Sequence, residues 1–368
     1  MNKNTKYILF FTLLFSGIYL IFSVFFQENY MSKSEVNIES DYTINQVIEE
    51  LNASGDLKNE WAFRILSKIK KYENNIKSGS FYLEGEYRLD DLINIIRIGN
   101  RKVINLQIPE NIRLIDSMIV FIENNLGYER GKLKSYLESG DNLPVIMKEN
   151  DTIRWTMESL PAFFIPNTYE LYSNILIEDF VKKMNLEYQN FWKAEITCLR
   201  ENDTIRCSRE NQLNFLNNNI PDNIKSQGYT LTKIGVSILA SIVEEEQAKR
   251  IEERPRIAGV YLNRLKNPKD YPKLQADPTV KFANNDFAIK RVLDKHTAID
   301  NPYNTYLYPG FPPGPIRIPS INSIDAVLNA ENHTYTFMCA GTNGYHKFTS
   351  SNNEHNRNKN KYQDSQGW

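Results

Sequence analysis

The sequence has 368 residues, and its 44 lysines and arginines nearly balance 45 aspartates and glutamates, giving a formal net charge of −1. A hydrophobic fraction of 41% and a charged fraction of 24% are those of a folded chain of about two domains, which excludes wholesale disorder and a polytopic membrane protein. No cationic excess is present to neutralise phosphates, so nucleic acid is not an expected partner, and three cysteines with four histidines are too few for a disulfide framework or a zinc site.

The chain begins with a short tail, residues 1–6, and an uncharged run over residues 7–26, YILFFTLLFSGIYLIFSVFF. As a helix this run would be about 30 Å long, which is the thickness of a bilayer core. A cleaved signal peptide is the alternative, but the run is longer than a usual signal-peptide core and no small-residue cleavage site follows it. The run therefore predicts a single transmembrane helix that stays on the protein.

The charges on either side of this run predict its orientation. Lys3 and Lys6 precede it, whereas Gln27, Glu28 and Asn29 follow it without a basic cluster. By the positive-inside rule, the N-terminal tail is cytoplasmic and the rest of the chain lies outside. We therefore expect a single-pass protein of the cell (inner) membrane whose remaining residues work in an oxidising, extracytoplasmic space.

A polar segment over residues 27–39 is expected to be a linker. Residues 40–108 then predict a small α+β module, whose first helix begins after a capping box formed by Thr43 and Gln46. Within this module the apolar spacing predicts helices over 44–54, 58–72 and 90–98, and strands over 81–83 and 103–108.

The larger remainder, residues 109–357, has a mainly helical pattern, and residues 358–368 are expected to be a polar tail. Apolar residues recur at helical spacing over 112–126, 129–138, 176–193, 209–217, 231–249 and 256–266, and strand patterns return over 334–340 and 345–349. The predicted fold class is therefore α+β, with one N-terminal transmembrane helix, a small α+β subdomain and a larger, mainly helical domain with short strands.

Two cysteines flank a short polar stretch. Cys198 and Cys207 enclose LRENDTIR, which is expected to form a hairpin. A disulfide between them is geometrically possible in an oxidising compartment, and two free thiols are the alternative. Cys339 has no obvious partner in the sequence.

The segment LTKIGVSILASIVEEEQAKR contains three adjacent glutamates that a helix turns in three directions. On a helical wheel Glu246 lies within the apolar stripe, Glu245 lies at its edge, and Glu244 lies on the opposite, polar side. A carboxyl group on an apolar face is disfavoured as an anion, so its pKa rises toward the value that a general acid needs. The alternative is that the helix ends here and Glu246 reaches water beside the basic residues that follow.

Two loops carry polar and aromatic side chains suited to a sugar ligand. In LQADPT, Gln275 and Asp277 combine an amide and a carboxylate with a proline turn, although capping of the next segment is an equal reading for Asp277. Over residues 301–319, the prolines of NPYNTYLYPGFPPGPIRIP limit flexibility and hold aromatic faces such as that of Tyr303, next to Asn304, in place for stacking. A polyproline ligand for a partner domain is the alternative reading of this loop.

Near the C-terminus, GYHKFT supplies His346, and the following His355-Asn356 pair adds a second histidine and Asn356. The spacing of the two histidines does not match a zinc template, and no third ligand is evident. Asparagine and histidine are useful hydrogen-bond partners for ligands rich in hydroxyl groups.

These segments together resemble the YceG-like family of membrane-anchored endolytic murein transglycosylases. The matching motifs, in chain order, are SGSFYLEGEYRLDDLINIIRIGN, FFIPNTYELY, SILASIVEEEQAKR with ERPRIAGVYLNRL, KLQADPTV, NPYNTYLYPGFPPGPIRIPS and GYHKFTSSNNEHN. The resemblance covers nearly the whole chain, from the anchor to about residue 357.

The resemblance implies a LysM-like subdomain over residues 40–108 and a YceG-like catalytic domain over residues 109–357. The family's essential glutamate, the last of its Ile-Val-Glu-x-Glu motif, falls on Glu246. Two departures concern the packing of the subdomains more than the chemistry. Residues 109–111 replace the family's usual Glu-Gly pair, and residues 194–208 look like an insertion.

The activity that the resemblance implies is cleavage of the β-1,4 bond between N-acetylmuramic acid and N-acetylglucosamine of nascent strands. Glu246 would act first as acid and then as base, leaving a 1,6-anhydro end and ending strand elongation without a metal or organic cofactor. The expected partners are peptidoglycan glycan strands, the membrane and peptidoglycan synthases. Substrate binding or support is assigned to Gln275, Asp277, Tyr303, Asn304, His346 and Asn356.

Two other functions fit the same residues. A lysozyme-like hydrolase would use Glu246 together with Asp277 as a second carboxylate. A non-catalytic, anchored glycan-binding scaffold would use the LysM-like module and the aromatic loop alone.

Overall fold

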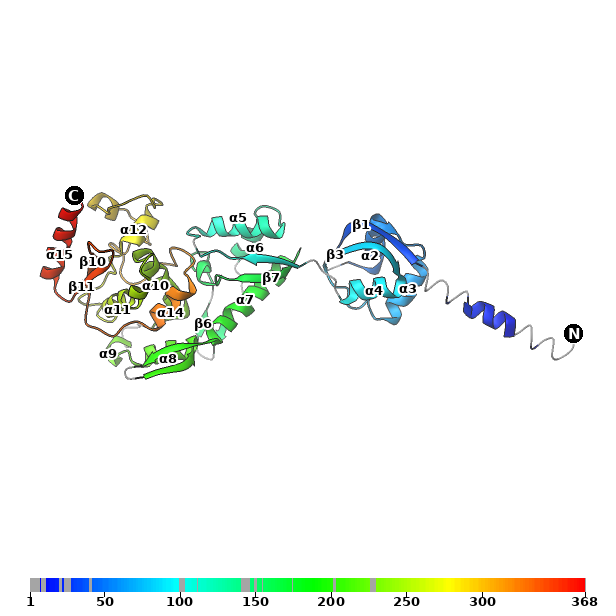
Figure 1. Cartoon of the computed structure of the whole chain (residues 1–368), viewed down its shortest axis with the longest axis horizontal. Coiled ribbons are helices and arrows are strands. Elements are labelled where there is room, and N and C mark those ends of the chain that lie inside the picture. Colours follow the sequence, from blue (N-terminus) through cyan, green and yellow to red (C-terminus); the bar gives the residue numbers. More distant parts are fainter. Residues whose placement is uncertain are drawn as a thin grey trace. The chain divides into compact units, whose positions relative to one another are not determined.

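The computed structural model describes residues 7, 11–19, 22, 28–39, 42–98, 103–110, 112–139, 146–148, 151–153, 155–173, 175–200, 203–225 and 230–367. Contacts divide the chain into two compact units (Figure 1). The first unit comprises residues 1–106, 125–128 and 169–176, and the second comprises residues 107–124, 129–168 and 177–368.

The first unit is built on a three-stranded antiparallel sheet of order β2-β1-β3, comprising β1 (Glu28–Ile38), β2 (Gly55–Asp56) and β3 (Gly79–Arg88). Strands β1 and β3 pair along their whole lengths, from Glu28 opposite Arg88 to Ile38 opposite Gly79. The helices α2 (Ile44–Ser54), α3 (Glu60–Ile69) and α4 (Leu89–Ile98) bury their apolar residues in a shared core with the sheet.

The sequence patterns placed these helices correctly. The predicted capping box is present, since Gln46 Oε1 accepts a hydrogen bond of 2.8 Å from the backbone N–H of Thr43. Val47, Ile48 and Leu51 then fall on the buried face of α2. A further two-stranded sheet joins β4 (Val103–Gln107) to β7 (Thr168–Tyr172).

The expected linker over residues 27–39 is wrong, because β1 occupies most of it. Although the segment is polar overall, apolar and polar residues alternate near its end. Val36 and Ile38 are buried, whereas Glu35 and Asn37 are exposed. Alternation of this kind is the signature of a strand with one face on a core. Whether the unit is LysM-like stays a prediction.

The predicted transmembrane helix over residues 7–26 is also wrong for this structure. Among the residues that the structure describes, no helix is both long enough and apolar enough to cross a bilayer. The prediction rested on the uncharged composition of the run and its length. The helical stretch described in this region covers residues 11–19, and its neighbours at 8–10, 20 and 21 lie outside the described residues.

The second unit contains most of the helices. Its elements are α5 (Ile115–Leu126), α6 (Lys132–Glu138), β5 (Ile146–Lys148), β6 (Asp151–Ile153), the 3₁₀ helix η1 (Leu160–Ala162), α7 (Ile177–Lys193), β8 (Glu195–Arg200), β9 (Asp203–Ser208), α8 (Arg209–Asn218), α9 (Asp222–Lys225), α10 (Lys233–Glu246), the 3₁₀ helix η2 (Ile251–Glu253), α11 (Arg254–Leu265), α12 (Asp277–Ala283), α13 (Asp294–Thr297), α14 (Ile321–Leu328), β10 (Phe337–Ala340), β11 (His346–Thr349) and α15 (Asn352–Ser365).

Helix α10 is the centre of this unit. It packs against α11, α12, α14 and η1, and α11, α12 and α14 can be followed around it in Figure 1. Eleven of its residues are buried, including the polar side chains of Ser237 and Ser241. A helix covered on every side has no polar face, which limits what a helical wheel can say about its glutamates.

Smaller elements lie around this helical core. Strands β10 and β11 form an antiparallel hairpin that contacts α15. Because α15 extends to Ser365, the residues expected to form a polar tail over 358–368 are largely helical. The hairpin predicted around the cysteines is β8–β9, and Cys198 and Cys207 form a disulfide, which settles the alternative left open above. Cys339 is a free thiol.

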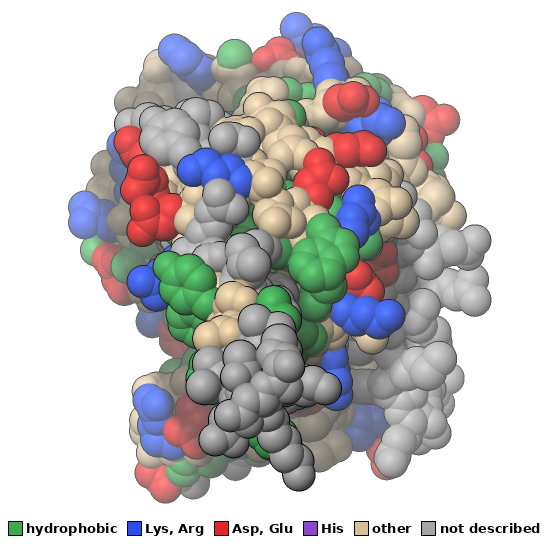
Figure 2. Space-filling view, turned by 90° about the vertical axis from the view of Figure 1, so that its right-hand side faces the viewer, with side chains coloured by type: hydrophobic (Ala, Val, Ile, Leu, Met, Phe, Trp, Pro, Cys, Tyr) green, Lys and Arg blue, Asp and Glu red, His purple; other side chains and the backbone are tan. Residues whose placement is uncertain are grey.

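The surface carries charges of both signs. On the face shown in Figure 2, lysines and arginines are interspersed with aspartates and glutamates, and hydrophobic side chains lie among them near the middle of that face. This mixture agrees with the near-zero net charge of the chain.

The proline-rich loop over residues 301–319 is held tightly at Gly314. A Cβ atom at this position would lie 1.8 Å from the backbone oxygen of Glu158 and 3.1 Å from the hydroxyl of Tyr303. Since these atoms leave no room for a methyl group, lack of space requires glycine here.

We expect Gly314→Ala to destabilise the protein by about 1–3 kcal/mol, the usual cost of overpacking, because the Glu158 backbone cannot rotate away as a side chain would. Thermal unfolding followed by circular dichroism measures the change. An unaltered unfolding midpoint would show that the loop is looser than the structure indicates.

Candidate active site

Three consecutive glutamates end helix α10, and each has a different set of partners. Glu244 and Glu245 form ion pairs with arginines, whereas Glu246 receives a hydrogen bond from a neutral tyrosine. These partners, rather than the position of each residue on a wheel, decide which carboxyl group is available for chemistry.

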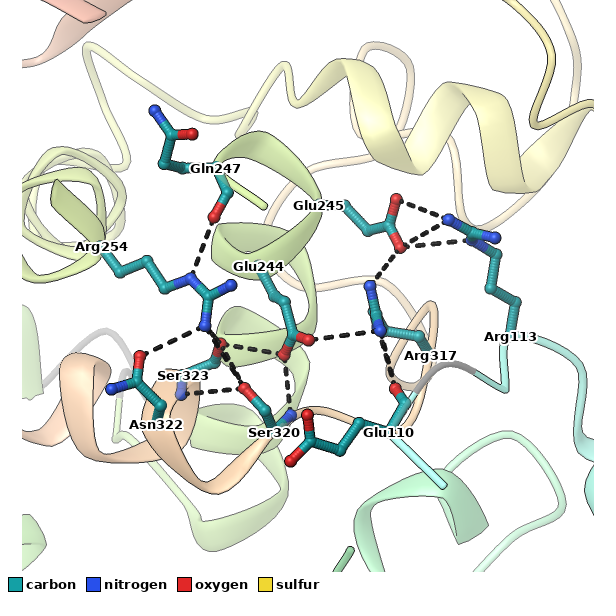
Figure 3. A network of polar contacts seen from close by, with 10 residues as sticks. All are labelled: Glu110, Arg113, Glu244, Glu245, Gln247, Arg254, Arg317, Ser320, Asn322 and Ser323. Atoms are coloured by element: carbon teal, nitrogen blue, oxygen red, sulfur yellow. Dashed lines mark hydrogen bonds and ion pairs between the residues drawn. The ribbon is translucent and has the colours of Figure 1, made fainter. Parts of the chain in front are cut away.

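Glu244 is a structural anchor. Only 5% of it is exposed, and its Oε2 accepts hydrogen bonds from the backbone N–H of Ser320 at 2.7 Å and the hydroxyl of Ser323 at 2.9 Å (Figure 3). Arg317 completes the set, with its Nη2 3.2 Å from Glu244 Oε1. The prediction that Glu244 faces a polar, solvated side is therefore wrong, because the N-terminus of α14 covers this side of α10.

Glu245 is clamped between two arginines, as Figure 3 shows. Arg113 donates from Nε at 3.2 Å and from Nη2 at 3.1 Å, and Arg317 donates from Nη1 at 2.7 Å. Arg317 also donates to the backbone oxygen of Glu110 at 2.8 Å. Both carboxylate oxygens of Glu245 are therefore occupied by arginine donors, so this side chain holds the end of α10 in place.

Glu246 differs from both neighbours. It is half-buried, and its Oε1 accepts a hydrogen bond of 2.6 Å from the hydroxyl of Tyr261, which is 3% exposed on α11. Burial raises the pKa of Glu246, and the negative charge of Asp277 raises it further. The hydrogen bond from Tyr261, followed by the charges of His346 and Lys281, partly offsets this rise in the pKa.

This environment contradicts the alternative in which Glu246 merely reaches bulk water at the end of the helix. A carboxylic acid that keeps its proton above the ordinary glutamate range is suited to donate a proton, and the anion that results is suited to take one back.

Asp277 lies close enough to act on Glu246 electrostatically. It is the first residue of α12, and its Oδ1 accepts a hydrogen bond of 2.7 Å from the hydroxyl of Tyr306. Burial and the charge of Asp277 in turn raise the pKa of Tyr306, so this hydroxyl stays protonated. The site therefore contains two pairs of a carboxyl group and a tyrosine, one from α10 and α11, and one from α12 and the proline-rich loop.

His346 is the first residue of β11, and the buried carboxylate of Glu253 holds its imidazole ring in place. Its Nδ1 lies 2.8 Å from Glu253 Oε2, and its backbone N–H donates to Glu253 Oε1 at 2.8 Å. Gln247, the residue after Glu246, donates to the same Glu253 carboxylate at 2.7 Å. This arrangement holds the imidazole ring beside the end of α10 and leaves Nε2 without a role in the Glu253 contact.

Gln275 has a strained backbone. Its φ angle of 52° lies in the left-handed region that residues with a side chain rarely adopt. Its backbone N–H donates to Thr305 at 3.1 Å, and its Oε1 accepts from Arg264 Nη1 at 3.2 Å. Strain of this kind is typical of functional sites, and here the contacts join the loop before α12 to the proline-rich loop.

The other predicted residues either support the proline-rich loop or are exposed on the surface. Asn304 is fully buried, and its amide donates to the backbone oxygens of Thr297 and Ile299, so it supports the loop. Tyr303 packs its ring 4.5 Å from that of Phe282, measured between centroids. Asn356 is exposed on α15, and no contact among the described residues joins it to Glu246.

Sequence reasoning missed several residues of the site. The sequence patterns assign no role to Tyr261, Glu253 or Lys281, and Tyr306 is only one of several aromatic residues of the proline-rich loop. The useful signal was the combination of a tyrosine with buried neighbours, which marks a hydroxyl that needs a partner. Among the described residues, no group of three or more histidines, cysteines, aspartates or glutamates is placed to hold a metal ion.

The geometry thus provides one half-buried carboxyl group of raised pKa, which is suited to general acid–base chemistry. A family model described as the YceG-like family matches residues 36–361, and the chain belongs to this family.

Two relatives found by sequence carry a functional name. The chain is 27% identical over 336 residues to the endolytic murein transglycosylase of Bacillus subtilis (strain 168), covering 89% of this chain and 84% of that protein. It is 25% identical over 339 residues to the endolytic murein transglycosylase of Streptococcus pneumoniae serotype 2 (strain D39 / NCTC 7466), covering 88% of this chain but only 57% of that protein.

A solved structure is also similar to the chain. The putative YceG-like protein from Listeria monocytogenes is 22% identical, with a TM-score of 0.48, covering 88% of this chain and 98% of that chain.

Two substitutions are expected to move the pKa of Glu246 in opposite directions. Tyr261→Phe removes a hydrogen bond to the carboxylate and should raise the pKa, so the acid form persists to higher pH. Asp277→Asn removes a nearby negative charge and should lower the pKa, so the proton is lost at lower pH.

The measurement is an NMR titration of glutamate carboxyl carbons, with Glu246→Gln used to assign the signal. Shifts of the same sign in both variants would contradict the arrangement described here.

Proposed function

We propose that the protein is a lytic transglycosylase that cleaves murein glycan strands at internal bonds. The names of its relatives in Bacillus subtilis and Streptococcus pneumoniae support this substrate. The observation that carries the chemistry is the half-buried carboxyl group of Glu246, whose hydrogen-bond partner is the neutral Tyr261 and whose pKa is raised.

The reaction uses one carboxyl group twice. Protonated Glu246 gives its proton to the glycosidic oxygen, and the bond between that oxygen and C1 of N-acetylmuramic acid breaks. The C6 hydroxyl of the same sugar then bonds to C1, and its proton passes to the Glu246 carboxylate. The products are a free 4-hydroxyl and a 1,6-anhydro end, no water is consumed, and the acid is restored.

The neighbours of Glu246 have consistent roles in this scheme. Tyr261 orients the carboxyl group and stabilises its anion after the first proton transfer. Asp277 keeps the carboxyl group protonated beforehand, and its charge favours the cationic character that develops at C1. Glu244 and Glu245, held by Ser320 and the two arginines, fix the end of α10 from which Glu246 projects.

Asp277 also favours a second reaction for the same site. A carboxylate near the catalytic acid is what a hydrolase uses to activate water or to form a covalent intermediate. Water would then replace the C6 hydroxyl, and a reducing end would form in place of the anhydro end.

The proposed setting is the extracytoplasmic space, where nascent strands are found. The disulfide between Cys198 and Cys207 supports this location, because such bonds persist in oxidising compartments. Ending the elongation of nascent strands, and contact with peptidoglycan synthases, are parts of the proposal that rest on the family resemblance.

Glu246→Gln is expected to reduce strand cleavage by about 100- to 10,000-fold, since the amide cannot donate and recover a proton. Digestion of purified glycan strands followed by mass spectrometry measures both rate and product. The matched control is Glu129→Gln, which alters a glutamate whose side chain is 82% exposed and should keep full activity.

The products distinguish the candidate functions. Anhydro ends formed by the natural protein support the transglycosylase, reducing ends indicate the hydrolase, and uncut strands indicate a glycan-binding scaffold. Full activity of Glu246→Gln would discard the assignment of the catalytic residue.

A further inference from the structure

The helix that carries Asp277 also presents side chains that the proposed reaction does not use. Helix α12 presents Asp277 and Lys281 four residues apart, so both project from one face of the helix. Both residues also act electrostatically on Glu246, which places that face of α12 beside the end of α10.

Lys281 is also part of the wall of a pocket. This pocket is open to solvent and has an empty volume of ≈ 300 Å³. Its apolar surface comes from Pro278, Phe282, Phe287 and Ile316, and its charged rim comes from Arg113, Glu245 and Lys281. The pocket therefore adjoins the face of α12 that carries Asp277 and Lys281.

The two cations of the pocket wall differ, because Arg113 forms an ion pair and Lys281 forms none among the described residues. Glu245 and Glu244 are engaged by Arg113 and Arg317, as Figure 3 shows. The ammonium of Lys281 has no ion pair or hydrogen bond with another described residue. An unpaired, half-buried cation above an apolar floor is complementary to a ligand that joins a carboxylate to small apolar groups.

Arg113 makes the apolar side of the pocket more rigid. Its guanidinium lies 4.7 Å from the centroid of the Phe287 ring while it also binds Glu245. Phe287 is 38% exposed, so one side of its ring remains free for a ligand. The aromatic wall is thus held in place by the same ion pairs that fix the end of α10.

The proposed substrate carries such a ligand at the right place, so this step rests on the proposed function. The N-acetylmuramic acid whose C1 reacts also bears, on its C3 oxygen, a lactyl group and a peptide stem. The stem begins with alanine and glutamate, which supply a methyl group and a carboxylate. Glu245, the neighbour of Glu246 on α10, lines the pocket together with residues of α12, so the pocket is the nearest described place for a stem on a sugar held at Glu246.

We propose that the pocket between α10 and α12 is a subsite for the first residues of the peptide stem. Lys281 binds a stem carboxylate, and Phe282 and Phe287 contact the lactyl and alanine methyl groups. The protein therefore acts preferentially on strands that still carry their peptides, in contrast to enzymes that follow the removal of stems.

The test compares two substrates, namely glycan strands with intact stems and strands from which an amidase has removed the stems. The natural protein should cleave the intact strands with the higher kcat/KM. Lys281→Gln and Phe287→Ala should each lower kcat/KM on intact strands by about tenfold, mainly through a higher KM. A tenfold change is the effect expected from the loss of one good polar or apolar contact. Phe287→Ala should have a much smaller effect on stripped strands, whereas Lys281→Gln also removes a charge that acts on Glu246 and is expected to alter the cleavage of both substrates.

Two variants are needed because Lys281 also acts on Glu246, whereas Phe287 makes no contact with it among the described residues. Lys290→Gln, which removes an exposed lysine that does not line the pocket, is the matched control and should leave the substrate ratio unchanged. Equal losses of Phe287→Ala on both substrates, or equal cleavage of both substrates by the natural protein, would overturn the subsite.

A binding measurement separates this inference from the proposed reaction. The Glu246→Gln protein should bind N-acetylmuramoyl-L-alanyl-γ-D-glutamate more tightly than N-acetylmuramic acid alone, with NMR shifts at Lys281 and Phe287. If strands are not cleaved but this difference in binding is found, the reaction fails and the subsite stands. If strands are cleaved but both ligands bind alike, the subsite fails and the reaction stands.

Discussion

The contact between the Tyr261 hydroxyl and the Glu246 carboxyl group is the interaction on which the site depends. It requires the end of α10 and the middle of α11 to be fixed relative to each other to within a fraction of an ångström. A neutral donor meets this requirement without stabilising the anion as strongly as an arginine would. The carboxyl group is thereby held in place and still keeps its proton.

The neighbouring ion pairs make this contact possible. Arg317 joins Glu244 to Glu245, Arg113 joins Glu245 to the segment before α5, and Gln247 joins the end of α10 to Arg254 on α11. Each of these charges is matched by a partner. Arg113 and Arg317 therefore pair with Glu244 and Glu245, and the hydrogen-bond donor to Glu246 is the neutral Tyr261.

Much of the fold follows from local patterns. Helical spacing located α7 and α11 to within two residues, and the capping box of Thr43 and Gln46 marked the first residue of α2. The same reasoning missed β1, because its alternation lies within a polar segment. It also took the residues beyond 357 for a tail, although α15 is a helix with few apolar residues whose N-terminus is capped by Ser351.

The site could be predicted from the sequence less well than the fold, for a physical reason. A helical wheel treats one helix alone, and it assigned Glu244 to solvent because nothing in that segment reveals that Ser320 and Ser323 lie opposite it. The wheel and the family motif both selected Glu246, but the partner that defines its environment is Tyr261, on the next helix. Contacts between elements shift the pKa of a carboxyl group, and the spacing of residues within one segment does not predict such contacts.

The three adjacent glutamates also make the site sensitive to register. Insertion or deletion of one residue within α10 would turn everything beyond it by about 100° and move it by about 1.5 Å. After an insertion Glu245 would face Tyr261, after a deletion Gln247 would, and in both cases the arginines would meet different side chains. Composition, net charge and hydrophobicity would hardly change, yet the chemistry would be lost. The proposed function therefore constrains the number of residues in α10. Related sequences should differ in length only in segments outside this helix.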